Sequence, residues 1–407
     1  MSAIPISNLR SVWDLVATLF LLLTIIQWRA EASLQPWVWL TCSAIAGLAV
    51  SALANGQQFT SMFGALVSVG SMMGTLIFIR RLYCRNSIHG LLAGACLATG
   101  EILHTVLVPN AVSSTNLWKY GVGFGAAIVL LALTATTRRT SIDLSAMAML
   151  AIISLATGTR GLTGSLVIAS VLVISRGVAR QRSLMVRIAA TMVIAVPAVT
   201  VALTLGGSLV NSPLANSARD KFVQQAAINS NPIFAGRTEP PISIAAVMTH
   251  PVIGAGANPE PTSEIISRAL QVADFLGYKN PTELVPWWTQ DNKIYTHSLV
   301  MEYWVVGGVL AALPFIAALG IFIVGLVRSL RIRKNIPAVV FFLAVQSLSN
   351  ILFAPETWGT TALVGLSVGM MLVTSFGHLK PDKSRSEKAE EPPRLRPQLG
   401  VAHSLSL

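Results

Sequence analysis

The sequence predicts an all-α polytopic membrane protein, with about 11–12 transmembrane helices and one large external loop that contains short helices. Three observations predict this fold. Charged residues make up only 11% of the 407 residues, against about 25% in a soluble domain. The long apolar stretches are continuous, whereas the strands of a membrane barrel would alternate apolar and polar residues. One interval, residues 206–296, is long and polar enough to fold outside the bilayer.

Eleven apolar stretches are expected to form the spanning helices. A helix needs about 20 residues to cross the hydrocarbon, so two of the stretches are short. These two are either helices broken at residues 157–161 or helices that tilt, with their loop dipping into the protein. The stretches are residues 12–28, 36–54, 60–79, 88–109, 117–136, 143–157, 162–175, 184–205, 298–327, 336–353 and 357–375.

Arginine-rich loops set the expected orientation, because lysine and arginine hold the cytoplasmic ends of spans. The interval 206–296 and the corner at 158–161 then face outward. Eleven spans with a cytoplasmic tail place the N-terminus outside, whereas Arg10 favours the inside. Either the N-terminus is external or the number of spans before residue 60 differs by one. The arginine-rich loops hold Arg80, Arg81 and Arg85; Arg138 and Arg139; Arg176, Arg180, Arg182 and Arg187; and Arg328, Arg331, Arg333 and Lys334.

The chain is therefore expected to have four parts. Residues 1–205 form an N-terminal transmembrane bundle, 206–296 the external (periplasmic) loop, 297–376 the C-terminal transmembrane helices, and 377–407 a basic cytoplasmic tail. The tail cannot bury a core and is expected to be disordered. The net charge of +12 does not indicate nucleic acid, because most of the excess lies in short loops and in the tail.

Two further sequence features bear on the class of protein. The cysteines, which are Cys42, Cys84 and Cys96, show neither metal-binding spacing nor a disulfide framework. The first apolar stretch lacks a convincing cleavage site, so we expect an uncleaved span and no signal peptide.

Short helices are expected within the external interval, at residues 217–228, 238–249 and 263–276. Thr238 would cap the second helix, and Gly277 would end the third. Trp287, Trp288 and Tyr295 would lie at the membrane surface as an aromatic belt. The alternative role for these aromatic side chains is stacking on sugar rings.

Three residues of the predicted outer side have side chains suited to chemistry. Arg160 is a lone arginine in a corner of small, uncharged residues, and Arg237 lies in the external interval. An arginine fork matches phosphate oxygens, although a lone arginine also snorkels and a loop arginine also pairs with a neighbour such as Glu239. His297 closes the interval, where the chain re-enters the membrane. It is either a helix-start histidine or a general base, with Asp291 or Glu302 to orient it.

The stretches around these three residues resemble motifs of the O-antigen ligase and polysaccharide polymerase family of bacterial inner-membrane proteins. Residues 157–161, Thr-Gly-Thr-Arg-Gly, resemble that family's Thr-x-Ser-Arg-Gly corner. Gly236-Arg237, followed by His250 to Gly256, resembles its arginine and Pro-x-x-Gly-x-Gly loop. His297-Ser298-Leu299-Val300-Met301, with Gly307-Gly308 beyond, is similar to its His-Asn-x-x-Leu segment. Ser298 departs from the usual Asn, and Val306 stands where the family has Glu.

The resemblance implies a GT-C-like glycosyltransferase that works without a metal or cofactor on the outer face of the inner membrane. Its donor would be a glycan on undecaprenyl pyrophosphate, and its acceptor a second glycan. His297 would deprotonate the acceptor hydroxyl, and Arg160 and Arg237 would hold the pyrophosphate. No Asp-x-Asp metal motif occurs in the external loops. Other loop residues expected to help are Arg219, Lys221, Arg268, Lys293 and, near the base, Glu302.

Several functions fit these motifs. A polymerase of O-antigen or exopolysaccharide is preferred, although the acceptor is not specified by the motifs. A ligase that transfers glycan to lipid A core, or an oligosaccharyltransferase that acts on protein, shares the same motifs. A transporter or flippase of lipid-linked sugar would show internal repeats and ionisable residues at mid-span, and no repeat is evident. A non-catalytic scaffold would make the arginine and histidine placement a coincidence. Other polysaccharide assembly proteins are expected partners.

Overall fold

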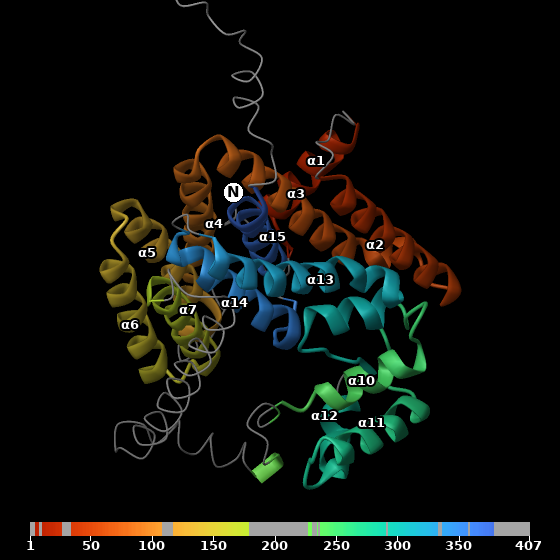
Figure 1. Cartoon of the computed structure of the whole chain (residues 1–407). Helices are drawn as coiled ribbons and strands as arrows, with labels where there is room; N and C mark the ends of the chain where they lie inside the picture. The colour runs from red at the N-terminus through yellow and green to blue at the C-terminus, as the bar shows by residue number, and fades with distance from the viewer. Residues whose placement is uncertain are drawn as a thin grey trace, which may run out of the picture.

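The computed structural model describes residues 5–7, 10–26, 34–107, 117–178, 227–229, 234, 237–289, 292–332, 336–356 and 359–377. This part of the chain is almost entirely helical, which confirms the all-α class (Figure 1). Its one sheet is a small antiparallel pair, β1 (Pro5–Ser7) and β2 (Arg10–Ser11). The α-helices are α1 (Val12–Ile26), α2 (Gln35–Ala54), α3 (Phe63–Arg85), α4 (Ser87–Leu107), α5 (Gly123–Thr137), α6 (Thr140–Ala156), α7 (Arg160–Val178), α10 (Pro240–Thr249), α11 (Ser263–Phe275), α12 (Val285–Thr289), α13 (Leu299–Arg331), α14 (Ala338–Phe353) and α15 (Thr360–Met371).

Ten of the eleven expected spans coincide with described helices, and the stretch 184–205 lies outside the described residues. Within the described residues, four helices, including α2, α4 and α13, are long and apolar enough to cross a membrane, and shorter apolar helices account for the other expected spans in that part of the chain. The corner at 157–161 separates two helices, as both alternatives require: α6 ends at Ala156, and α7 begins at Arg160. These helices are those of an all-α polytopic membrane protein. The three cysteines are free.

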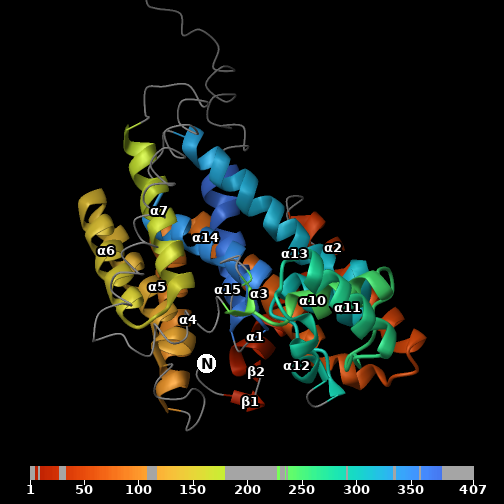
Figure 2. The same cartoon turned by 90° about the horizontal axis from the view of Figure 1, so that it is seen from below.

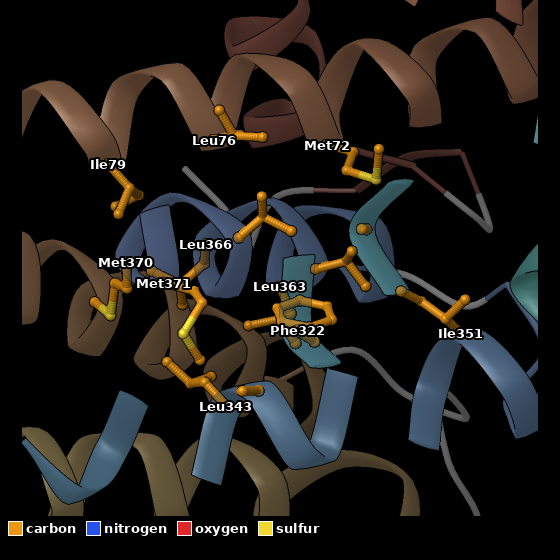
Figure 3. Packing of buried hydrophobic residues seen from close by; sticks show 14 of the residues in the cluster. Met72, Leu76, Ile79, Phe322, Leu343, Ile351, Leu363, Leu366, Met370 and Met371 are labelled. Carbon is orange, nitrogen blue, oxygen red and sulfur yellow. The ribbon is translucent and has the colours of Figure 1, made fainter. Parts of the chain in front are cut away.

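Small residues let the central helices approach one another. A Cβ on Gly365 of α15 would collide with the carbonyl oxygen of Met72 on α3, so only glycine fits there. Such small residues are typical of helix contacts in membranes. Figure 3 shows Met72, Leu76 and Ile79 of α3 on one side of this contact, with Leu366 of α15 opposite. The buried contact fixes α15 and, through it, the neighbouring α14.

Loops that the arginine distribution predicts on the same side of the membrane meet one another. On the predicted cytoplasmic side, Arg176 Nη1 donates to Ile336 O (3.3 Å), and the Arg328 guanidinium lies over the Phe376 ring at 4.4 Å. On the other side, Asn55 Nδ2 donates to Gly254 O at 3.3 Å. The contacts agree with the predicted alternation of sides.

Helix α13 differs from the single span expected at 298–327, because it is broken at Gly308 (φ 71°, ψ −171°). The ring centroids of Tyr303 and Phe315 lie 4.4 Å apart, although twelve positions of straight helix would separate them by about 18 Å. The segment 299–307 therefore folds back on the segment 309–331, as the ribbon in Figure 1 shows. Irregular backbone at membrane depth is tolerated where protein buries it, and Gly308 is buried.

The helices α10, α11 and α12 form a second, smaller hydrophobic core beside the bundle (Figures 1 and 2). Thr262 caps α11 by accepting from Ile265 N, and the chain turns at Gly277 (φ 79°), as predicted. The predicted cap at Thr238 is wrong: α10 begins after Glu239, because the first position inside the helix is Pro240. Most of the expected helix at 217–228 lies outside the described residues.

The expected aromatic belt is wrong for Trp288, which is 3% exposed and belongs to the second core. Its Nε1 donates to Thr238 O at 2.6 Å. Trp287 and Tyr295 remain exposed. The neighbouring tryptophans differ because α12 turns only one of them toward α10 and α11.

Candidate functional site

His297 lies directly before the broken helix α13, at the edge of the second core. Ser298, the next residue, caps α13 by accepting from Met301 N, and its Oγ donates to Ile351 O at 2.9 Å. These two hydrogen bonds fix the backbone on which His297 stands, against the last turn of α14. The histidine side chain is 42% exposed, although its Nδ1 atom is buried. The open part of the ring therefore lies away from Nδ1.

The carboxylate beside His297 is Glu239, with Oε1 lying 3.3 Å from His297 Nδ1. The distance between the two atoms is that of an ion pair. The geometry does not make a hydrogen bond, and Nδ1 has no hydrogen-bond partner within the described residues. The other oxygen, Oε2, accepts from Thr238 N at 3.0 Å. The Glu239 side chain is only 22% exposed. Sequence reasoning considered Glu239 only as a partner of Arg237, because 58 positions separate it from the histidine.

Arg237 binds the end of α14. Its Nη1 donates to Phe353 O at 3.0 Å, and its guanidinium lies over the Phe353 ring, 4.6 Å from the centroid. A helix C-terminus carries unsatisfied carbonyls and partial negative charge, so a cation is stabilised there. Burial lowers the pKa of Arg237, and the nearby Glu239 opposes that shift. Arginine remains protonated at any ordinary pH, so its N–H donors that make no contact within the described residues can bind an oxyanion.

Two buried aromatic residues hold the segment that carries Arg237 and Glu239. Tyr278 Oη donates to Arg237 O, and Trp288 Nε1 donates to Thr238 O, both at 2.6 Å. Each of these side chains is 3% exposed. Burial raises the pKa of Tyr278, and the negative charge of Glu239 raises it further, so the phenol stays protonated and donates. The second core thus fixes the backbone from which both charged side chains extend.

Glu302 lies in the first turn of α13, half-buried. Its Oε2 accepts from Glu356 N at 3.1 Å, and the Glu356 carboxylate in turn accepts a short hydrogen bond from Ser68 of α3. These contacts join α13, the segment after α14 and α3 on the same side as His297. Asp291, the other carboxylate considered for orienting the base, lies outside the described residues.

The backbone of Arg160 is placed at the same end of the bundle. Helix α7 packs against α14, and the contact from Arg176 to Ile336 joins the end of α7 to the start of α14. The two helices are therefore antiparallel, and both are about 25 Å long. The start of α7, at Arg160, consequently lies toward Phe353, the end of α14 to which Arg237 binds. The Arg160 side chain is outside the described part of the structure.

The two remaining helper candidates that the structure describes, Arg268 and Lys293, make contacts other than with His297. Arg268 Nη2 pairs with Glu264 Oε1 at 3.0 Å on the exposed face of α11, where both line an open cavity of about 420 Å³. Lys293 Nζ lies over the Tyr295 ring at 5.8 Å. Arg219 and Lys221 lie outside the described residues.

The Pro-x-x-Gly-x-Gly loop has a structural role beside the site. Ala255 N and Gly256 N donate to Val305 O and Val306 O, at 2.6 and 3.2 Å. The break at Gly308 leaves these carbonyls without helical partners, since a helical carbonyl accepts from the residue four positions on. The loop therefore supplies the hydrogen bonds that these two carbonyls lack in the broken helix, and it holds segment 299–307 in place.

Comparison with known proteins identifies one family. The family model described as O-Antigen ligase matches residues 144–316. That interval contains Arg160, Arg237 and His297 together with the break in α13. No curated protein and no solved structure matches the chain.

Proposed function

From the premise that this chain belongs to an O-antigen ligase-like family, we propose that it is a polymerase of surface polysaccharide, such as O-antigen or exopolysaccharide. The family indicates an enzyme of the ligase or polymerase type that acts on lipid-linked glycan in a membrane. The proposed donor is a glycan on undecaprenyl pyrophosphate, and the proposed acceptor is a sugar hydroxyl of a second glycan. The proposed location is the outer face of the bacterial inner membrane.

One observation carries this proposal: the end of α14 gathers an arginine and a histidine from different parts of the chain. Arg237 binds Phe353 O, and Ser298, the neighbour of His297, binds Ile351 O. Glycosyl transfer from a pyrophosphate needs both kinds of group. A base takes the proton of the acceptor hydroxyl, and a fixed cation stabilises the departing pyrophosphate.

In the proposed step, the acceptor oxygen forms a bond to the anomeric carbon of the donor while the bond from that carbon to the pyrophosphate oxygen breaks. The hydroxyl proton passes to His297. The electron pair of the broken bond leaves with undecaprenyl pyrophosphate, whose charge Arg237 and Arg160 stabilise. No metal or cofactor takes part in this proposal, because the two guanidinium groups supply the positive charge that the leaving group requires.

The description of the family favours a second function, an O-antigen ligase that transfers glycan to lipid A core. The proposed chemistry at His297 and the arginines is the same. Only the acceptor differs, so glycan length and attachment separate the two functions.

The test uses a deletion strain complemented with wild type, His297→Ala, Arg237→Ala or Arg160→Ala, with membrane levels of each protein measured. Polysaccharide is resolved on gels. Single repeat units in all three variants, with normal protein levels, support the polymerase. Long chains that stay unattached to lipid A core support the ligase. His250→Ala is the matched control, because it removes a half-buried histidine of the same loop. Wild-type polysaccharide in the three variants would contradict both functions.

A further inference from the structure

We propose that Glu239 is a positioning residue that holds His297 with its Nε2 atom free to accept the substrate proton. The inference rests on the proposed function of His297 as the base. It starts from the contact between His297 Nδ1 and Glu239 Oε1, at 3.3 Å. Nδ1 is buried, whereas 42% of the side chain is exposed. Since the exposed part of the ring lies away from Nδ1, a substrate approaches from the Nε2 side.

The chemistry of the carboxylate determines which nitrogen carries the proton. A neutral imidazole has one N–H donor and one acceptor nitrogen, and an ionised carboxylate only accepts. Glu239 therefore favours the tautomer with hydrogen on Nδ1, which leaves the Nε2 lone pair available. When Nε2 takes a proton from the acceptor hydroxyl, the ring becomes positive, and the adjacent carboxylate stabilises that charge. An aspartate has this role beside the histidine of serine proteases.

The structure restricts Glu239 to this contact. Its Oε2 is occupied by Thr238 N at 3.0 Å, which leaves Oε1 for the histidine. The backbone on which it stands is held on both preceding carbonyls by the buried donors Tyr278 and Trp288. A carboxylate fixed on a rigid segment orients a base without a loss of rotamer entropy during the reaction. The long contact closes with a small rotation of the imidazole, as catalytic hydrogen bonds do when substrate binds.

The charges around the pair do not remove the carboxylate from the histidine. Arg237 stands two residues before Glu239, but its hydrogen bond goes to Phe353 O and its plane lies on the Phe353 ring. On the side of α13, Glu302 accepts from the backbone of Glu356. Within the described residues, Glu239 Oε1 thus lies at ion-pair distance from His297 Nδ1.

The first measurement is steady-state polymerisation in membrane vesicles that carry each variant, with the lipid-linked repeat unit extracted from the deletion strain as substrate. Glu239→Gln keeps the shape of the side chain, but its amide also donates and so allows the wrong tautomer. We expect its kcat to fall about 100-fold, within the range that a general base contributes, with KM for the lipid-linked donor unchanged. Glu239→Asp, which keeps the charge, is expected to recover about 10-fold of that loss.

Glu260→Gln is the matched control, because it removes an exposed carboxylate from the same loop; we expect wild-type kinetics. Wild-type kcat in Glu239→Gln, or a change confined to KM, would overturn the assignment. Equal losses of kcat in Glu239→Gln and Glu239→Asp at normal protein levels would also overturn it. If Glu239 had only a structural role, restoring the negative charge with aspartate would not restore kcat. If Glu239→Gln fails to accumulate, the kcat of Glu239→Asp decides by the same criterion: full loss overturns the role. His297→Ala runs in parallel, and activity in that variant would contradict the proposed function itself.

Discussion

Gly254 packs so closely on Gly308 that a Cβ on Gly254 would lie 2.5 Å from the Gly308 backbone nitrogen. Gly308 is the point where α13 breaks, and Gly254 belongs to the loop that satisfies the broken helix. Both residues have positive φ, 83° and 71°, a conformation that glycine adopts without steric cost. The two glycines therefore hold segment 299–307, and with it the backbone next to His297.

Gly254→Ala is expected to destabilise the protein by about 3 kcal/mol, about 1–2 from left-handed backbone and the rest from the clash. Thermal unfolding of the purified protein in detergent measures the loss. Gly277→Ala is the matched control, since Gly277, which follows α11, also has positive φ (79°) but open space around its Cβ position. We expect a loss of about 1 kcal/mol there. Equal losses at the two positions would show that the contact with Gly308 adds nothing.

The positions of the helices followed from the sequence because an apolar run of about 20 residues has few alternatives to a helix in a membrane. The break in α13 did not follow. Residues 303–327 carry no charged side chain, and glycine is common within membrane helices, so Gly307-Gly308 gave no separate signal of a break. The break is stabilised by the loop at 254–256, which supplies donors to Val305 O and Val306 O. That is a contact between segments about 50 positions apart.

Only part of the site was predicted, because the rest also depends on contacts between segments that are distant in the sequence. The arginine and histidine motifs indicated Arg237 and His297, and the structure brings both to the end of α14. The carboxylate partner was sought near His297 in sequence, whereas Glu239 arrives from the start of α10. The burial of Trp288 likewise depends on packing, because the sequence offers two identical neighbours and no means of choosing between them.

Arg237→Lys tests whether the planar fork of arginine matters. Lysine keeps the charge but cannot bind two oxygens in one plane, so we expect kcat/KM for the lipid-linked donor to fall about 10-fold, and about 100-fold for Arg237→Ala. Polymerisation in vesicles measures both. Phe353→Leu serves as the control for placement: it removes the ring under the guanidinium but keeps the carbonyl. A loss of a few-fold is expected there. Wild-type kinetics in Arg237→Ala would exclude Arg237 from pyrophosphate binding.

Ser298→Ala should weaken the contacts that fix the backbone next to His297. It removes the cap of α13 and the hydrogen bond to Ile351 O, and we expect a loss of about 1–2 kcal/mol in unfolding free energy. Polymerisation should fall with it, because His297 is the preceding residue. Ser298→Asn restores a side-chain cap and should recover most of the stability. If Ser298→Ala unfolds as wild type does, the cap does not contribute to holding the site.

Tyr278 makes the stability of the second core sensitive to alkaline pH. Its ordinary pKa is 10.0, and burial raises it in the folded protein. The unfolded chain therefore releases this proton at lower pH than the folded chain does. The stability from the neutral phenol is complete below about pH 10 and is lost as pH rises above that value.

Tyr278→Phe cannot ionise, so its unfolding free energy should change less between about pH 9 and 11 than that of the wild type. At pH 7 the variant should be weaker by about 1–3 kcal/mol, because Arg237 O loses its donor. Unfolding followed by tryptophan fluorescence, at pH 7 and across the alkaline range, measures both effects, since Trp288 lies in the same core. Parallel curves for the two proteins would show that Tyr278 ionises alike in the folded and unfolded chains, and its phenol would then not be the fixed donor that holds Arg237 and Glu239.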